Sequence, residues 1–195
     1  MSAPERLSSF GPDFTPGRHG AHGRAPVTMA ERKVDIVQVM ASLGGDAAAA
    51  SAVGSALPGP GKAEIAGASM TVWIQPSGWL VIRPRGAEGA LVTTLASTAG
   101  EAAAVVDQGH GKAVLRLSGS QAGDVLAKGS RVDLHARTFP PGSAATTTID
   151  HITVTIVKVD ATTFDLVLPA NFAEAFADWL KMAAAEFGYE IGKPT

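Results

Sequence analysis

Three histidines are the side chains of this sequence best suited to acid–base chemistry. His110, His135 and His151 stand apart from one another, and each could act as a general base because imidazole changes its charge near neutral pH. A serine nucleophile would need a Gly-x-Ser-x-Gly turn, which the Ser118–Ser120 stretch lacks. The chain has no cysteine, which excludes thiolate nucleophiles, disulfides and metal sites built on sulfur. A structural role is therefore expected for each histidine.

Four aspartates could supply paired carboxylates, but their positions indicate local structural roles. They are Asp107, Asp124, Asp133 and Asp150, and they fall at predicted strand ends, turns or early helix positions. Asx turns and favourable charge near a helix N-terminus explain such residues. The residues taken alone describe a chain without a self-contained active site.

The glycine-rich loops do not match nucleotide-binding motifs. A phosphate loop around Gly109–Lys112 would need glycine where Val106 stands and serine or threonine where Ala113 stands. The Gly59-x-Gly61 pair lacks the third glycine of a dinucleotide fingerprint, because Glu64 occupies that position. No Rossmann site is expected.

The overall composition is typical of a modest globular protein. Its 195 residues are 46% hydrophobic and 17% charged, which is enough apolar material for one core. A net charge of −2 gives no field that would attract nucleic acid or an anionic membrane. Apolar stretches such as Ile152–Val157 are far shorter than the ~20 residues that span a bilayer. We expect a soluble, cytoplasmic protein with no nucleic-acid or membrane partner.

Residues 1–26 are expected to form a flexible extension outside the core. They mix glycine and proline with serine, arginine and histidine and contain no apolar stretch typical of a signal peptide. Such a segment buries too little apolar surface to order itself, so it is either disordered or laid along a partner. His19 and His22 form a His-x-x-His pair, but no further ligand nearby completes a metal site.

The hydrophobic pattern predicts two similar series of elements. The first series has strands at 33–40, 70–74 and 79–82 and helices at 46–56 and 89–97. The second has strands at 112–118, 151–158 and 163–168, a helix at 121–128, and a last helix that Asn171 and Glu174 open as a capping box. On the last helix, Phe172, Phe176, Trp179, Ala183 and Phe187 share one face and are expected to fill a core.

The two series also match in their sequence. Val37–Ser42 lies over Val114–Gly119 with an offset of 77, and Trp79–Pro84 lies over Phe164–Pro169 with an offset of 85. We therefore predict an α+β fold for residues 27–195 as a single domain of two similar halves, about 33–98 and 112–188. Each half is a strand-helix-strand-strand-helix unit.

The stretch from His110 to Gly142 resembles the gamma subunit of heterotetrameric sarcosine oxidase. The residues that carry the resemblance are His110–Gly119, Asp124–Gly129, Asp133–His135 and Phe139–Gly142, followed by Thr163–Pro169 and the Trp179-Leu180 helix. The resemblance is close over about 113–188 and looser over 27–82.

This resemblance implies a fold similar to the folate-binding domain of the glycine-cleavage aminomethyltransferase, or T-protein. It also implies an accessory chain bound to a large alpha subunit, with beta and delta subunits completing the complex. Such a complex oxidatively demethylates sarcosine to glycine, transfers the one-carbon unit to tetrahydrofolate and forms hydrogen peroxide. The other subunits are then expected to hold FAD, FMN, NAD, tetrahydrofolate and zinc, and this chain none.

Two departures from related chains bear on function. Aminomethyltransferase-like chains carry Asp-x-Ser where this sequence reads Asp107-Gln108-Gly109, which argues against folate handling here. A branch linked to iron–sulfur repair carries Lys-Gly-Cys and an aromatic residue where this sequence reads Lys128–Arg131, without a thiol. Both departures favour a chain with no reactive group of its own.

The leading hypothesis is a non-catalytic accessory subunit. The contact with its partner is expected at exposed loop residues, together with the N-terminal segment; these residues are His110, Gly111, Phe139, Pro140 and Pro141. Two alternatives are a free-standing folate-binding protein of one-carbon metabolism and a similar subunit of an enzyme for another N-methyl amino acid. Nucleic-acid modification has no basic or aromatic platform to support it.

Overall fold

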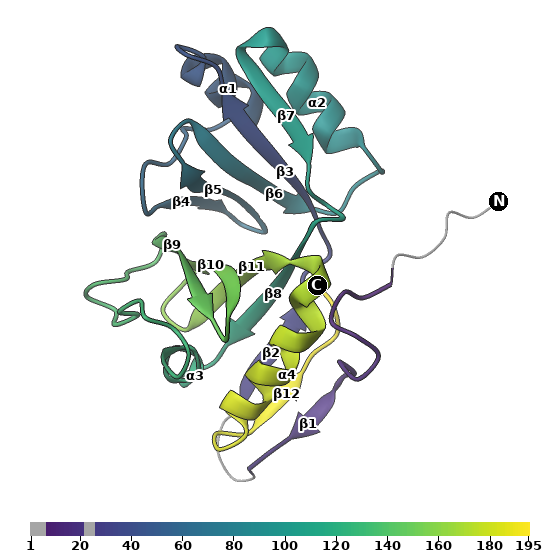
Figure 1. The fold of residues 1–195 in the computed structure, drawn as a ribbon, viewed down its shortest axis with the longest axis vertical. Helices are drawn as coiled ribbons and strands as arrows, with labels where there is room; N and C mark the ends of the chain where they lie inside the picture. Colours follow the sequence, from purple (N-terminus) through teal and green to yellow (C-terminus); the bar gives the residue numbers. More distant parts are fainter. Residues whose placement is uncertain (1–6, 22–25) are drawn as a thin grey trace, which may run out of the picture.

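The computed structural model describes residues 7–21 and 26–195, which form two β-sheets with helices on their outer faces (Figure 1). The first half comprises a five-stranded sheet, in the order β4-β5-β6-β3-β7, with helices α1 and α2. Its elements are β3 (Val34–Ala41), α1 (Asp46–Val53), β4 (Ala63–Ala66), β5 (Ser69–Gln75), β6 (Gly78–Pro84), α2 (Ala90–Ala99) and β7 (Ala103–Asp107).

The second half comprises a seven-stranded sheet, in the order β1-β12-β2-β8-β11-β10-β9, with helices α3 and α4. Its elements are β1 (Gly17–His19), β2 (Val27–Glu31), β8 (Lys112–Ser118), α3 (Ala122–Ala127), β9 (Ala144–Ile149), β10 (Ile152–Lys158), β11 (Thr163–Pro169), α4 (Ala173–Ala184) and β12 (Tyr189–Ile191). Short 3-10 turns, η1 (Gly100–Ala102) and η2 (Ala170–Phe172), precede β7 and α4.

The strand pairings of the two halves correspond position by position. Ile36 on β3 pairs with Ile82 on β6, and Val114 on β8 pairs with Val167 on β11. These pairs are separated by 78 and 85 positions, which agrees with the repeat expected from the sequence. The predicted α+β fold of two similar units is confirmed.

The sequence pattern did not reveal how the halves exchange strands. β7 pairs with β3 in the first half, and β2 occupies the corresponding place beside β8 in the second half. β2 leads directly into β3, and β7 leads directly into β8. The strand that precedes each half in the chain therefore belongs to the sheet of the other half, which ties the two halves together.

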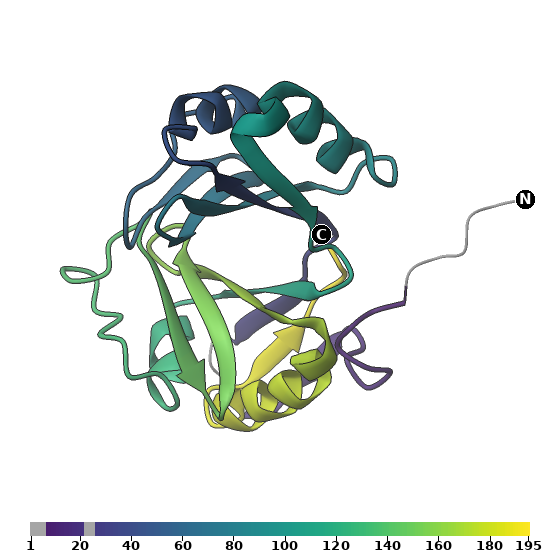
Figure 2. The same ribbon diagram turned by 45° about the horizontal axis from the view of Figure 1, so that its top comes forward.

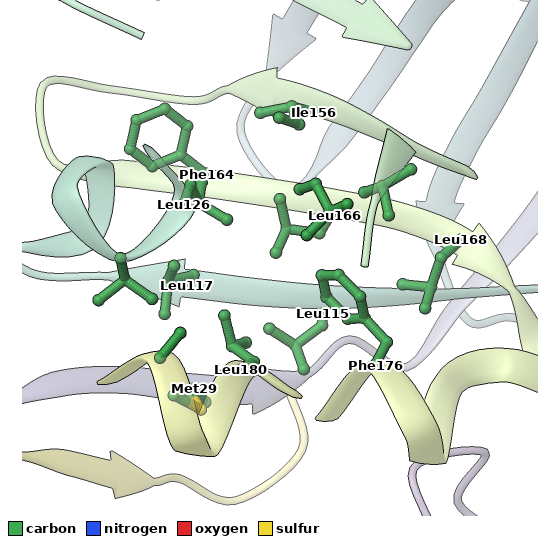
Figure 3. Packing of buried hydrophobic residues seen from close by; sticks show 14 of the residues in the cluster. Met29, Leu115, Leu117, Leu126, Ile156, Phe164, Leu166, Leu168, Phe176 and Leu180 are labelled. Carbon is green, nitrogen blue, oxygen red and sulfur yellow. The ribbon is translucent and has the colours of Figure 1, made fainter. Parts of the chain in front are cut away.

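The two sheets face each other, so the molecule has four layers, with α1 and α2 outside one sheet and α3 and α4 outside the other (Figure 2). A middle core between the sheets contains Ile36 and Ile82 from the first half and Val114 and Val167 from the second. The largest core lies between the second sheet and its helices, where Leu115, Leu166 and Phe176 pack together (Figure 3). Burial of these apolar side chains is the main force that holds the layers together.

The N-terminal segment differs from the expected extension outside the core. Phe10 is 1% exposed and packs in the core under α4, where Phe14 contacts its ring at a centroid distance of 5.3 Å. β1 pairs with β12 at the edge of the second sheet. Burial of the Phe10 ring, its contact with Phe14 and the pairing of β1 with β12 all contribute to ordering this segment.

The start of the last helix also differs from the prediction. Phe172 occupies the N-cap position of α4 and no side chain caps the helix, so the capping box at Asn171 and Glu174 is wrong. The 3-10 turn before α4 moves Asn171 out of the capping position. Phe176 is fully buried as expected, whereas Phe172 is 48% exposed because it precedes the helix.

Candidate interaction surface and the charged residues between the sheets

His110 and Gly111 form the exposed tip of the loop between β7 and β8. The turn is held by the Gln108 carbonyl, which accepts hydrogen bonds from the backbone N–H groups of Gly111 and Lys112. Ser9 and Gly109 line the same small depression, so the N-terminal segment lies beside this loop. The structure therefore brings together two of the expected contact regions.

The Phe139–Pro141 loop lies at the other end of the second sheet. The Gly142 N–H donates to the Lys158 carbonyl at the end of β10, whereas Lys112 pairs with Pro169 at the opposite end of β8 and β11. The expected contact loops consequently do not form one continuous surface.

The prediction that Phe139 is an exposed contact residue is wrong. It is 6% exposed and belongs to the core of the second half, because the connection between α3 and β9 folds over the sheet and inserts Leu134 and Phe139. Only Pro140 and Pro141 of this loop remain exposed.

Two of the four aspartates proposed for local roles, Asp107 and Asp133, stabilise turns. The Asp107 carboxylate accepts the Gly109 N–H at 2.7 Å, and the Asp133 carboxylate accepts the His135 N–H at 3.0 Å. That hydrogen bond, with a smaller contribution from Thr138, holds the pKa of Asp133 below its usual value.

No group of three or more histidine, aspartate or glutamate residues is arranged to hold a metal ion within residues 7–21 and 26–195. His19 stacks on Tyr189 with ring centroids 5.2 Å apart, and His22 lies outside the described residues. None of the described helices is long and apolar enough to cross a membrane.

The Lys128–Arg131 segment is packed against α4. Lys128 donates to the Ala183 carbonyl and forms an ion pair with Glu186. A side chain at Gly129 would overlap the Trp179 ring, with a contact of 2.5 Å. The close approach of this segment to the helix accounts for the glycine.

A buried charge cluster between the sheets was missed by the sequence analysis. Asp165 on β11 is completely buried and accepts hydrogen bonds from two arginines. Arg32, in the link between β2 and β3, donates from Nη1 at 2.7 Å, and Arg116 on β8 donates from Nε at 2.7 Å and from Nη2 at 2.9 Å. The only sequence signal is a charged residue inside each of two otherwise apolar strands, Arg116 and Asp165.

The cluster carries one carboxylate and two guanidinium groups, so its charges are unequal. The hydrogen bond to Asp165 raises the pKa of Arg116, although partial burial opposes this shift. The Arg32 side chain is 4% exposed and also donates to the Ala68 carbonyl of the first half. Because Arg32 contacts residues of both halves, the cluster joins the two sheets by directional bonds.

Comparison with known proteins places the chain among sarcosine oxidase subunits. The model of the sarcosine oxidase gamma subunit family matches residues 41–186. The sarcosine oxidase subunit gamma of Corynebacterium sp. strain P-1 is 36% identical over 159 residues, which cover 79% of this chain and 76% of that protein. The protein of the same name from Corynebacterium sp. strain U-96 is 33% identical over 147 residues, with coverage of 73% and 70%.

Two solved structures resemble the fold. A chain of the heterotetrameric sarcosine oxidase from Corynebacterium sp. U-96, in complex with pyrrole 2-carboxylate, superimposes with a TM-score of 0.79 at 30% identity, covering 86% of this chain and 88% of that one. The glycine cleavage aminomethyltransferase T from Bartonella henselae superimposes with a TM-score of 0.64 at 17% identity, covering 88% of this chain and 48% of that one. The second likeness concerns the fold alone.

Proposed function

The chain belongs to the sarcosine oxidase gamma subunit family, and we propose that it serves the heterotetrameric oxidase as an accessory subunit without catalytic residues of its own. The observation that carries this proposal is the dispersal of its polar groups. Asp107 and Asp133 are engaged in turns, and Arg32 and Arg116 both form ion pairs with Asp165 between the sheets.

The cofactors of the reaction are proposed to reside in the other subunits. FAD, FMN, NAD, tetrahydrofolate and zinc are the groups that this family's complex implies. In support, Gly109 stands where the folate-handling pattern has serine, and its N–H donates to the Asp107 carboxylate within the turn. We assign the assembly to the cytoplasm, where the required folate and nicotinamide cofactors are available.

The alpha subunit is the proposed contact partner, through the loop at His110 and Gly111 and the neighbouring N-terminal segment. Leu7 is 88% exposed in that segment, and Ser9 lines the same depression as Gly109. An exposed apolar side chain beside a rigid turn is typical of a protein–protein contact. Pro140 and Pro141 lie at the far end of the sheet and are assigned to a separate, smaller contact.

Photo-crosslinking within the assembled oxidase tests the contact. A benzoylphenylalanine at position 110 is expected to crosslink to the alpha subunit, identified by mass spectrometry. The same probe at exposed Thr148, in β9, serves as the control and is expected to give little product. Equal crosslinking from both positions, or none from position 110, would contradict the contact.

The absence of a catalytic role is tested by replacing all three candidate bases together. The His110→Ala/His135→Ala/His151→Ala variant is expected to assemble and to retain sarcosine turnover within about twofold, because a lost general base costs ~10²- to 10⁴-fold. A tenfold loss of kcat at unchanged subunit stoichiometry would show that this chain takes part in the chemistry.

A further inference from the structure

A hollow opens on the helix-covered face of the first half, beyond the end of α1 and beside the edge strand β4. Its volume is about 260 Å³, close to the lower limit for small-molecule sites. It is lined by Val53, Gly54, Ser55, Glu64, Ala66, Ser69, Met70, Thr71 and Arg83. Polar side chains thus converge on a sheet surface that normally packs against a core.

The second half fills the corresponding place with apolar residues. The cross-strand pair Met70–Ile82 of the first half corresponds to the pair Thr155–Val167 of the second half. The next residues along these strands therefore also correspond, Thr71 to Ile156 and Arg83 to Leu168. Ile156 and Leu168 are 0% and 1% exposed and lie in the core (Figure 3).

The connections that follow the first helix of each half explain why only one half has a hollow. Residues 128–143 link α3 to β9 and insert Leu134 and Phe139 into the core. The shorter link of residues 54–62 between α1 and β4 inserts no comparable pair, and only Leu57 packs partly against the core. Arg83 and Thr71 therefore lie at positions that are buried and apolar in the second half, because the loop of the first half inserts no comparable side chains there.

Arg83 is the cation of this hollow, and its guanidinium is only partly satisfied. Nη1 donates to the carbonyls of Met70 and Ile82, and Nη2 donates to the Val53 carbonyl. A guanidinium has five N–H groups, so two remain without a protein acceptor within the part of the chain that the structure describes. Partial burial lowers the pKa of Arg83, and no described carboxylate forms an ion pair with it.

The same hollow also presents negative charge. Glu64 lines it from β4, and the C-terminal end of α1 at Val53 and Gly54 contributes the negative end of the helix dipole. Ser55, Ser69 and Thr71 add hydroxyl groups. An incoming acid alone would meet Arg83 but also the repulsion of Glu64, whereas a ligand with both charges would match each of them.

We propose that this hollow binds a small zwitterionic α-amino acid, with its carboxylate on Arg83 and its ammonium group between Glu64 and the end of α1. The fork of the guanidinium suits the two oxygens of a carboxylate. The volume is ample for a small α-amino acid such as glycine. All of its lining residues belong to the first half of this chain.

Hydrogen–deuterium exchange of the assembled oxidase tests the proposal, because it reports on this chain independently of the catalytic subunits. Glycine, acetate and methylammonium are added separately at the same millimolar concentration. Glycine is expected to slow exchange at least twofold in peptides covering residues 53–55 and 64–71, whereas acetate and methylammonium, which carry one charge each, have smaller effects. Equal effects of glycine and acetate would contradict recognition of the zwitterion.

Two variants test the residues. Arg83→Met is expected to weaken glycine binding at least tenfold, because a charge-assisted pair is lost. Arg137→Met, on an exposed arginine of the second half outside the hollow, serves as its control. Since Arg83 also binds backbone carbonyls, Glu64→Gln on an exposed residue provides a second test that leaves those bonds intact, and it should weaken glycine binding severalfold.

Unchanged exchange on addition of glycine, or glycine protection that survives in both variants, would overturn the proposal. Peptides already protected in the complex and insensitive to every probe would also overturn it, and would indicate a partner's side chain in the hollow.

Discussion

The two halves of the molecule share their strand pairing but differ at three corresponding positions between the sheets. In the second half, Arg116 pairs across the strands with Asp165, and Arg32 joins them from the link before β3. In the first half, Gln38 pairs with Leu80, and Gln108 in the link before β8 donates to the Gln38 side chain at 3.3 Å.

The backbone confirms that Arg32 and Gln108 occupy equivalent places. The Arg32 N–H donates to the Val114 carbonyl, and the Gln108 N–H donates to the Ile36 carbonyl of the other half. The same architecture is therefore built once with a charge cluster and once with neutral side chains. The fold does not require the charges, so their contribution lies in fixing how the halves meet. Mutations can replace the charged side chains of the second half by the neutral ones of the first.

The largest expected effect follows from breaking the cluster. Asp165→Leu, which introduces the residue found at the corresponding position of the first half, leaves Arg32 buried without a carboxylate. We expect a loss of about 3–5 kcal/mol in the free energy of unfolding, or roughly 10 °C in Tm for a chain of this size. Urea and thermal unfolding measure it, and a loss below about 1 kcal/mol would show that the cluster is already open to water.

The triple variant Asp165→Leu/Arg32→Gln/Arg116→Gln sharpens the same comparison. It places the neutral side chains found in the first half, those of Leu80, Gln108 and Gln38, at the corresponding positions of the second half. No buried charge is then left without a partner. It is expected to recover most of the stability lost in Asp165→Leu, because replacing a whole buried ion cluster is often close to neutral. A triple variant as unstable as the single one would mean that the halves are not interchangeable at these positions.

A somewhat smaller effect is expected from the loop that closes the second half. Phe139→Ala should cost about 3 kcal/mol through loss of buried surface and formation of a cavity. Leu57→Ala in the corresponding loop of the first half is the matched control and should cost about 1 kcal/mol, because Leu57 is only partly buried. Equal losses in the two variants would contradict the assignment of Phe139 to the core.

The smallest effect concerns the turn at Asp160, between β10 and β11. Its carboxylate accepts the Thr162 N–H at 2.9 Å, which together with weaker bonds holds the pKa of Asp160 below its usual value. The stabilisation is therefore complete above the unfolded-state pKa of about 3.9 and is lost as the pH falls through the lower folded-state value.

Asp160→Asn should flatten the dependence of Tm on pH below about pH 4. The corresponding turn of the first half, Gln75–Gly78, has no titratable side chain and provides the reference. If the dependence of Tm on pH in this range is unchanged in the Asp160→Asn variant, other carboxylates cause it.

The sequence predicted those parts of the fold that local pattern determines. β10 alternates Ile152, Val154 and Ile156 on one face, and this period was sufficient to identify the strand and its hairpin partner β11. The edge strands β4 and β9 were missed because Ala63–Ala66 and Ala144–Ile149 consist largely of small and polar residues. Their strand conformation comes from pairing with a neighbour rather than from their own composition.

The charged features could not be predicted because they depend on distant contacts. Arg32 and Asp165 are 133 residues apart in the sequence, and only the exchange of β2 between halves brings them together. Phe139 was mistaken for a surface residue because the Pro140-Pro141-Gly142 turn that follows it is typical of exposed loops. Neither the hollow at Arg83 nor its contrast with Leu168 can be seen until the two sheets are aligned.

The central claim, that this chain works as an assembled subunit, is tested most directly by co-expression of the tagged chain with the other subunits of its own oxidase. We predict that it elutes with them on gel filtration, with one copy per complex by mass measurement. Elution of the folded chain as a free monomer, while the other subunits assemble into an active oxidase without it, would contradict the account.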